Sequence, residues 1–262
     1  MKRRIPLGPA EGWLTLASVF LICLTMAWAI DDSRWVLGNP DYLDLLAVAA
    51  VGGVLVGFIG PKVGWGRWLT FLIGAVFAAL LVPLLVALVD GGAPLGELYR
   101  TTAASTVQAY VDIAILDLSS TTQYLHYILV LALVVWATSM FASYAVFGHH
   151  RPLSAVVAVG VVLIVNMSLT FTPQLPYLVL FTVASLLLLI RSHVYDEQSE
   201  WVRRRIGDPA SISSVYLRGG VAFVTAAVAA AVFLTYTAAS APLAGAWDGV
   251  EDGLILQPVI FG

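Results

Sequence analysis

Long apolar stretches alternate with short polar segments along almost the whole chain. Each of seven stretches comes close to the roughly 20 apolar residues that a helix needs to cross a bilayer. They cover residues 12–30, 43–59, 68–89, 124–147, 153–171, 175–190 and 219–238. The pattern predicts an all-α, polytopic membrane helix bundle with about seven transmembrane helices.

Basic residues fall in every second gap between these stretches. Eleven of the thirteen Lys and Arg residues precede the first stretch or lie in the second, fourth and sixth gaps, and only Arg34 and Arg100 lie elsewhere. Because cytoplasmic loops retain Lys and Arg, the pattern places the N-terminus in the cytoplasm and the C-terminus outside. The largest basic group, Arg203, Arg204 and Arg205, lies in the predicted cytoplasmic loop 191–218.

The composition leads to the same class of protein. Hydrophobic residues make up 60% of the 262 residues and charged residues 11%, whereas soluble domains carry about 25% charged residues. We expect a multi-span membrane domain over 1–238, with an outside loop 90–123, and an extracytoplasmic tail or linker over 239–262. The bilayer is then the main partner. Nucleic acid is not expected as a partner, because the one basic cluster is short and lies beside a membrane.

Two segments carry a more specific structural signal. Gly53 and Gly57 lie one helical turn apart in the stretch 43–59, and such small residues let a neighbouring helix approach closely. Gly60 and Pro61 are expected to end that helix. In the outside loop, apolar residues recur with helical spacing from Val107, which predicts a helix lying on the outer membrane surface or on the bundle.

Few polar side chains fall within the stretches. None of them carries Asp, Glu, Lys or Arg near its middle, which argues against ion- or proton-coupled transport but leaves a neutral pore open. Asn166, Ser168 and Thr170 form the most polar group. They either line a path or, as we favour, hydrogen-bond to a neighbouring helix. Pro83 marks a static kink or a hinge, and Trp136, in mid-stretch, is expected to pack.

No catalytic, cofactor or metal site is predicted. Cys23 is the only cysteine and lies in the middle of the first stretch, where it reads as a small apolar side chain rather than a nucleophile. His149 and His150 are adjacent but lack the spacing of a metal site. The first stretch also has some features of a cleavable signal peptide, although it is longer than the usual apolar core.

Four short motifs stand out between and after the last two stretches. They are Glu197-Gln198-Ser199-Glu200-Trp201, Arg203-Arg204-Arg205-Ile206-Gly207-Asp208-Pro209 and Ser213-Ser214-Val215-Tyr216-Leu217-Arg218-Gly219-Gly220 in the loop, and Ser240-Ala241-Pro242-Leu243-Ala244-Gly245-Ala246-Trp247 after the last stretch. With these motifs the chain resembles bacterial membrane-anchored transglutaminase-like proteins of the TgpA type. The resemblance implies a membrane region followed by an extracytoplasmic domain with a Cys-His-Asp triad. No triad residue can be carried over to this chain, so we expect the membrane part of a longer or split protein, or a stand-alone relative.

These observations predict a non-catalytic membrane region in the bacterial plasma membrane. It would anchor and orient an extracytoplasmic, cysteine-protease-like domain of the transglutaminase-like kind, in cis or in trans, at the cell envelope. The alternative is a permease or channel subunit for a small neutral solute. A third reading is an assembly or sensing subunit that uses the loop 90–123.

Overall fold

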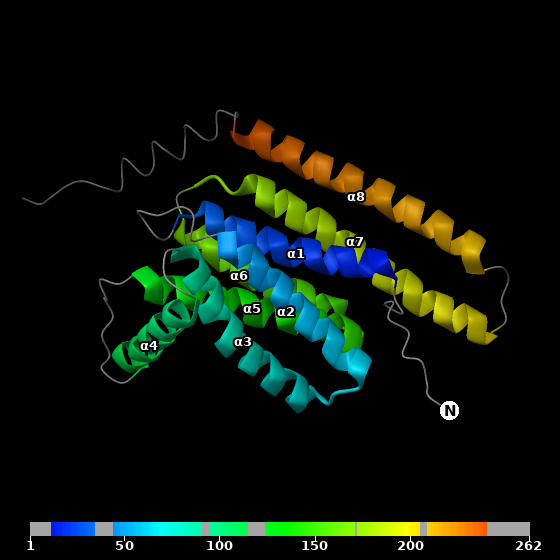
Figure 1. Ribbon diagram of the computed structural model, residues 1–262. Helices are drawn as coiled ribbons and strands as arrows, with labels where there is room; N and C mark the ends of the chain where they lie inside the picture. Colours follow the sequence, from blue (N-terminus) through cyan, green and yellow to red (C-terminus); the bar gives the residue numbers. More distant parts are fainter. Residues whose placement is uncertain are drawn as a thin grey trace, which may run out of the picture.

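The computed structural model describes residues 12–34, 44–90, 95–114, 124–170, 172–204 and 209–239. All regular structure in these residues is helical (Figure 1). The helices are α1 Trp13–Asp32, α2 Asp44–Val63, α3 Arg67–Asp90, α4 Leu95–Ala114, α5 Tyr124–His149, α6 Pro152–Leu169, α7 Leu175–Arg204 and α8 Pro209–Ala239.

The helices have the length and composition of membrane spans. Six of them, α1, α2, α3, α5, α6 and α7, contain segments long and apolar enough to cross a membrane. The described apolar part of α8, Arg218–Phe233, is shorter. The all-α, multi-pass membrane bundle is therefore confirmed, while the count of seven spans and the orientation remain predictions.

The helices run back and forth between two ends of the bundle (Figure 1). The connections α2–α3 and α5–α6 lie at one end, together with the start of α1, the last turn of α7 and the first turn of α8, and the start of α7 lies at the other. Helices α1 and α5 supply much of the buried apolar core, including Ile22, Met26, Ile128 and Val135. Helix α8 lies on the outer side of α7, and Gly220 of α8 faces Ile190 of α7.

Helical structure continues into the predicted loop 191–218, and its cytoplasmic location stays a prediction. Helix α7 continues without interruption to Arg204, and α8 begins at Pro209, ten residues before the predicted span. With 30 residues, α7 is about 45 Å long, which exceeds a hydrocarbon core of about 30 Å. Neither Gly nor Pro occurs between Arg191 and Arg204, so the helix continues where the apolar stretch ends. The fall in hydropathy after Ile190 therefore does not coincide with the end of the helix.

The end of α2 was also predicted too early. The helix passes through Pro61 and ends at Val63, and Gly64 then adopts the left-handed backbone conformation with φ of 83°. The N–H of Trp65 bonds to the carbonyl of Gly60 at 2.9 Å, and the N–H of Gly64 bonds to that of Pro61 at 3.1 Å. These two bonds form a Schellman motif, in which a glycine terminates the helix. Pro61 is tolerated in the last turn, and Gly60, directly before it, does not stop the helix.

The helix predicted from Val107 begins earlier than its apolar spacing indicated. Helix α4 starts at Leu95, and its first three turns contain Thr, Ser and Arg side chains that blur the apolar pattern. It packs against α3 and α5 at the end of the bundle where α3 ends. Of the two predicted settings, the structure therefore shows a helix on the bundle. The segment after Ala114 lies outside the described residues.

Candidate functional site

A buried amide cluster joins α1, α6 and the connection to α7. Asn166 of α6 donates from Nδ2 to Gln174 Oε1 at 2.9 Å and to the Ala29 carbonyl of α1 at 3.1 Å. Gln174 Nε2 donates to the same carbonyl at 2.6 Å. Ser33 contacts both amides and donates to Ala29 O at 2.7 Å. The two amide side chains are only 6% and 3% exposed.

This cluster closes the end of a helix. Ala29 lies in the last turn of α1, where helix carbonyls lack partners and carry partial negative charge. The Ala29 carbonyl accepts the backbone N–H of Ser33 at 3.2 Å, and the amide N–H groups of Asn166 and Gln174 add two further donors to it. Each interhelical bond of this kind contributes about 0.6 kcal/mol, at most about 1.7, so the cluster acts as a clasp between three segments.

The predicted polar group on α6 does not assemble into a path. Ser168 is exposed and donates to the carbonyl of Ile164 in its own helix. Thr170 contacts Thr172 at 3.2 Å. Of the three predicted residues, Asn166 makes the interhelical bonds, and its partner Gln174 was not foreseen. Gln174 lies in the short connection between two apolar stretches, where a polar residue is ordinary, so the sequence did not single it out.

Helices α2 and α5 share the most extensive interface among the described helices. A side-chain carbon built on Gly53 would meet the carbonyl of Trp136 and lie 3.1 Å from the amide nitrogen of Met140. One built on Gly57 would meet the carbonyl of Met140 and lie 2.9 Å from Ser143 Cβ. At both positions the neighbour is the backbone of α5, which has no room to move aside locally.

The close approach permits a hydrogen bond between the two helices. Ser143 of α5 donates its hydroxyl to the carbonyl of Val54 of α2 at 2.8 Å, and the pair is buried. A serine hydroxyl is short, so this bond requires the backbone separation that glycines allow. The glycine face and the bond therefore form a single packing unit, which we call the α2–α5 seam.

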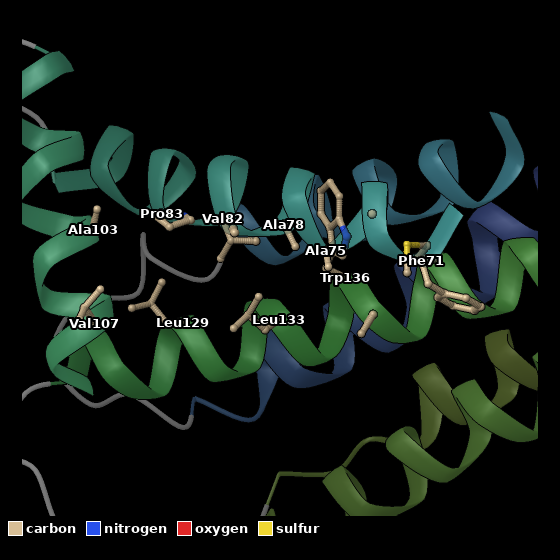
Figure 2. A pocket seen from close by; sticks show the side chains of 14 residues that line it. Phe71, Ala75, Ala78, Val82, Pro83, Ala103, Val107, Leu129, Leu133 and Trp136 are labelled. Atoms are coloured by element: carbon tan, nitrogen blue, oxygen red, sulfur yellow. The ribbon is translucent and has the colours of Figure 1, made fainter. Parts of the chain in front are cut away.

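A cavity of about 610 Å³ lies between α3, α4 and α5. Figure 2 shows it extending along α3 and α5 from Ala103 and Val107 of α4 to Phe71. All fourteen lining residues are Gly, Ala, Val, Leu, Pro, Phe, Met or Trp. Pro83 of α3 lies in its wall. The size is that of a small-molecule site, but such sites usually carry several polar groups as well.

Trp136 contributes the one polar side-chain atom among these lining residues. Its side chain is 2% exposed, and the buried indole Nε1 has no hydrogen-bond partner among the described residues. The six-membered ring lies against α2, where a carbon on Gly52 would be 3.0 Å from Cη2. An unpaired buried donor lowers the stability of a fold by about 1–3 kcal/mol. The packing role predicted for Trp136 accounts for the ring but not for the nitrogen.

The remaining candidate residues do not form a site. Cys23 is fully buried in α1. His149, the last residue of α5, and His150, which follows it, are exposed. In the described part of the chain, no three His, Cys, Asp or Glu side chains are grouped to hold a metal ion. Arg203 and Arg204 form the end of α7, and Arg205 lies outside the described residues.

Small residues on α3 were a signal that sequence reasoning missed. Ala75, Ala78 and Ala79 follow the three- and four-residue spacing of one helix face, and all three line the cavity.

Comparisons with protein-family models, curated proteins and solved structures gave no match to this chain. The function is therefore inferred from the residues and their geometry.

Proposed function

We propose that this protein is a non-catalytic membrane anchor of the bacterial plasma membrane that orients an extracytoplasmic, transglutaminase-like domain, joined to it or assembled with it. The observation that carries this proposal is the amide clasp. It fixes α1, α6 and α7 to one another at the end of the bundle that the basic residues predict to lie outside. An extracytoplasmic domain that is held in one orientation needs a rigid attachment at this end of the bundle.

The use of polar groups in the bundle favours an anchor over a permease. A path for a neutral solute needs hydrogen-bonding groups in succession across the membrane. Two of the interhelical polar bonds join a side chain to a helix carbonyl, from Asn166 to Ala29 and from Ser143 to Val54, and the bonds among Asn166, Gln174 and Ser33 are confined to one end of the bundle. The cavity beside α3 is lined by apolar residues, which offer no such succession.

The anchor proposal is tested by two measurements on the full chain. The first is purification from native membranes together with the product of an adjacent reading frame that encodes a Cys-His-Asp domain. We expect a stable complex with thiol-dependent acyl-transfer activity, and no activity from the chain alone, because such chemistry requires a thiolate beside an imidazole.

The second measurement separates the anchor from the permease. Vesicles containing the purified chain are mixed with glycerol or urea, and swelling is followed by light scattering. We expect the rate of empty vesicles. Swelling well above that rate would replace the anchor with the permease. A domain that stays soluble when it is produced together with the chain would also count against the anchor.

A further inference from the structure

Most cations of the described residues lie toward the end of the bundle where α1 starts. They include Lys62 and Arg67 beside the α2–α3 connection, Arg151 before α6, Arg191 of α7 and Arg218 of α8. The carboxylates of α1, α2 and α4 lie at the opposite end. Those of α7 begin only at Asp196, about 7.5 Å further along the helix than Arg191. The end of the bundle at the start of α1 therefore attracts anions.

Arg191 lies against the start of α1. A Cβ built on Gly12, the residue before α1, would be 3.1 Å from Arg191 Nη2. Arg191 Nε is buried and has no hydrogen-bond partner in the described part of the chain. The side chain as a whole is only partly buried, whereas Arg67, Arg151 and Arg218 are exposed. A partner that comes from the surface therefore meets the terminal nitrogens of Arg191 and not Nε.

The start of α1 adds positive charge at the same place. The first N–H groups of a helix lack carbonyl partners and carry partial positive charge. The N-cap residue Gly12 makes no side-chain hydrogen bond to them, and the first turn contains no acidic residue. The guanidinium of Arg191 therefore lies beside a second positive group, and an anion between the two would interact favourably with both.

Both groups lie at the depth of the lipid head groups. Helices α1 and α7 are long and apolar enough to cross a membrane, and Arg191 directly follows the apolar stretch 175–190. Trp13, the first residue of α1, is 69% exposed, and tryptophan is enriched at the boundary between membrane and water. The anions that a surface meets at this depth are the phosphates of phospholipids.

We propose that Arg191 and the start of α1 bind the phosphate of one anionic phospholipid. The phosphate accepts hydrogen bonds from the terminal nitrogens of Arg191 and from N–H groups of the first turn of α1, and an acyl chain lies along Leu14, which is 60% exposed. Basic pockets between membrane helices hold lipid head groups in this way. The other cations at this end favour a lipid with net negative charge over a zwitterionic one. The inference is independent of the anchor function, because it rests on the charges at this end alone.

Native mass spectrometry of the full chain in mild detergent tests the proposal. The probes are phosphatidylglycerol and phosphatidylethanolamine with identical acyl chains, so that they differ in the head group. We expect one tightly held phosphatidylglycerol, with an affinity at least about fivefold above that of phosphatidylethanolamine, the ratio that one Arg near an anionic lipid supplies. Equal affinities would overturn the proposal. This comparison uses the unaltered chain, so it holds even if a variant fails to fold.

Variants separate a defined site from diffuse attraction. Arg191→Gln should lower the affinity for phosphatidylglycerol to that for phosphatidylethanolamine, and Arg191→Lys, which keeps the charge, should retain most of it. Arg151→Gln removes the same charge from an exposed residue at the same end and should change the affinity by less than about twofold. Arg100→Gln, on α4 at the opposite end, should leave it unchanged. Equal losses in Arg191→Gln and Arg151→Gln would show diffuse attraction and overturn the site.

Two further arms identify the anion. A large excess of inorganic phosphate should not displace phosphatidylglycerol, because it lacks the acyl chains; displacement would assign the site to a soluble anion and overturn the lipid proposal. Glu11 precedes Gly12 in the sequence and lies outside the described residues. Glu11→Gln should change the affinity for phosphatidylglycerol by less than about twofold. A preference for this lipid that appears only in Glu11→Gln would make Glu11 the partner of Arg191 and overturn the proposal.

Discussion

The α2–α5 seam makes the substitution Gly57→Ala informative, because its expected sign opposes helix propensity. Alanine is favoured over glycine in a helix by about 1 kcal/mol. At Gly57, however, the added carbon would meet the carbonyl of Met140 and lie 2.9 Å from Ser143 Cβ and 3.1 Å from the Tyr144 nitrogen. Ordinary contact begins at 3.4 Å, so α2 and α5 must move apart by about half an ångström to one ångström.

The cost follows from what the two helices share. Separation stretches the bond from Ser143 to Val54, now 2.8 Å, and its loss costs about 0.6–1.7 kcal/mol. Strain from overpacking adds about 1–3 kcal/mol. After the gain from propensity, we expect a net destabilisation of about 1–3 kcal/mol. At about 2–4 °C per kcal/mol for a chain of this size, the melting temperature falls by about 2–12 °C.

The assay is thermal unfolding of purified protein in mild detergent, followed by the monodisperse fraction on size exclusion. Gly219→Ala is the matched control, because a carbon built on Gly219 in α8 meets nothing within 4 Å. It should be neutral or slightly stabilising. Leu55→Ala, at a side chain of α2 that is 43% exposed, should change stability by less than about 0.5 kcal/mol. Equal shifts for Gly57→Ala and Gly219→Ala would refute the packing argument.

Three further outcomes are expected. Asn166→Ala should lower the stability in detergent by about 1–3 kcal/mol, because it removes hydrogen-bond donors from the buried amide cluster. Ser168→Ala, at an exposed site, should have little effect, and equal melting temperatures for the two variants would contradict a stabilising role of the cluster. Reporter fusions after Arg151 should report cytoplasm and those after Ala241 the outside, and a cytoplasmic signal from the second would break the seven-span topology. Cys23, with no exposed surface, should resist maleimide in native membranes and react after denaturation in SDS; rapid native labelling would show that α1 is not central.

Much of the secondary structure is visible in the sequence, because apolar length is a local property. A stretch near 20 apolar residues has to form a helix in hydrocarbon, where every backbone group needs a partner. The positions of α1, α3, α5 and α6 follow from this rule alone. The rule does not apply to polar segments, and α7 continues to Arg204, past the end of the apolar stretch 175–190.

The sequence by itself also indicated that Gly53 and Gly57 form a close-packing face and that Asn166 bonds across helices. It did not indicate the partners. In a membrane helix nearly every face is apolar, so amphipathicity does not tell which face meets protein and which meets lipid. Only the tertiary structure decided that α5 lies on the glycines, that Gln174 meets Asn166 over the end of α1, and that α3, α4 and α5 leave a space beside Trp136. These contacts depend on how several helices pack together at once, and no short window of residues contains that information.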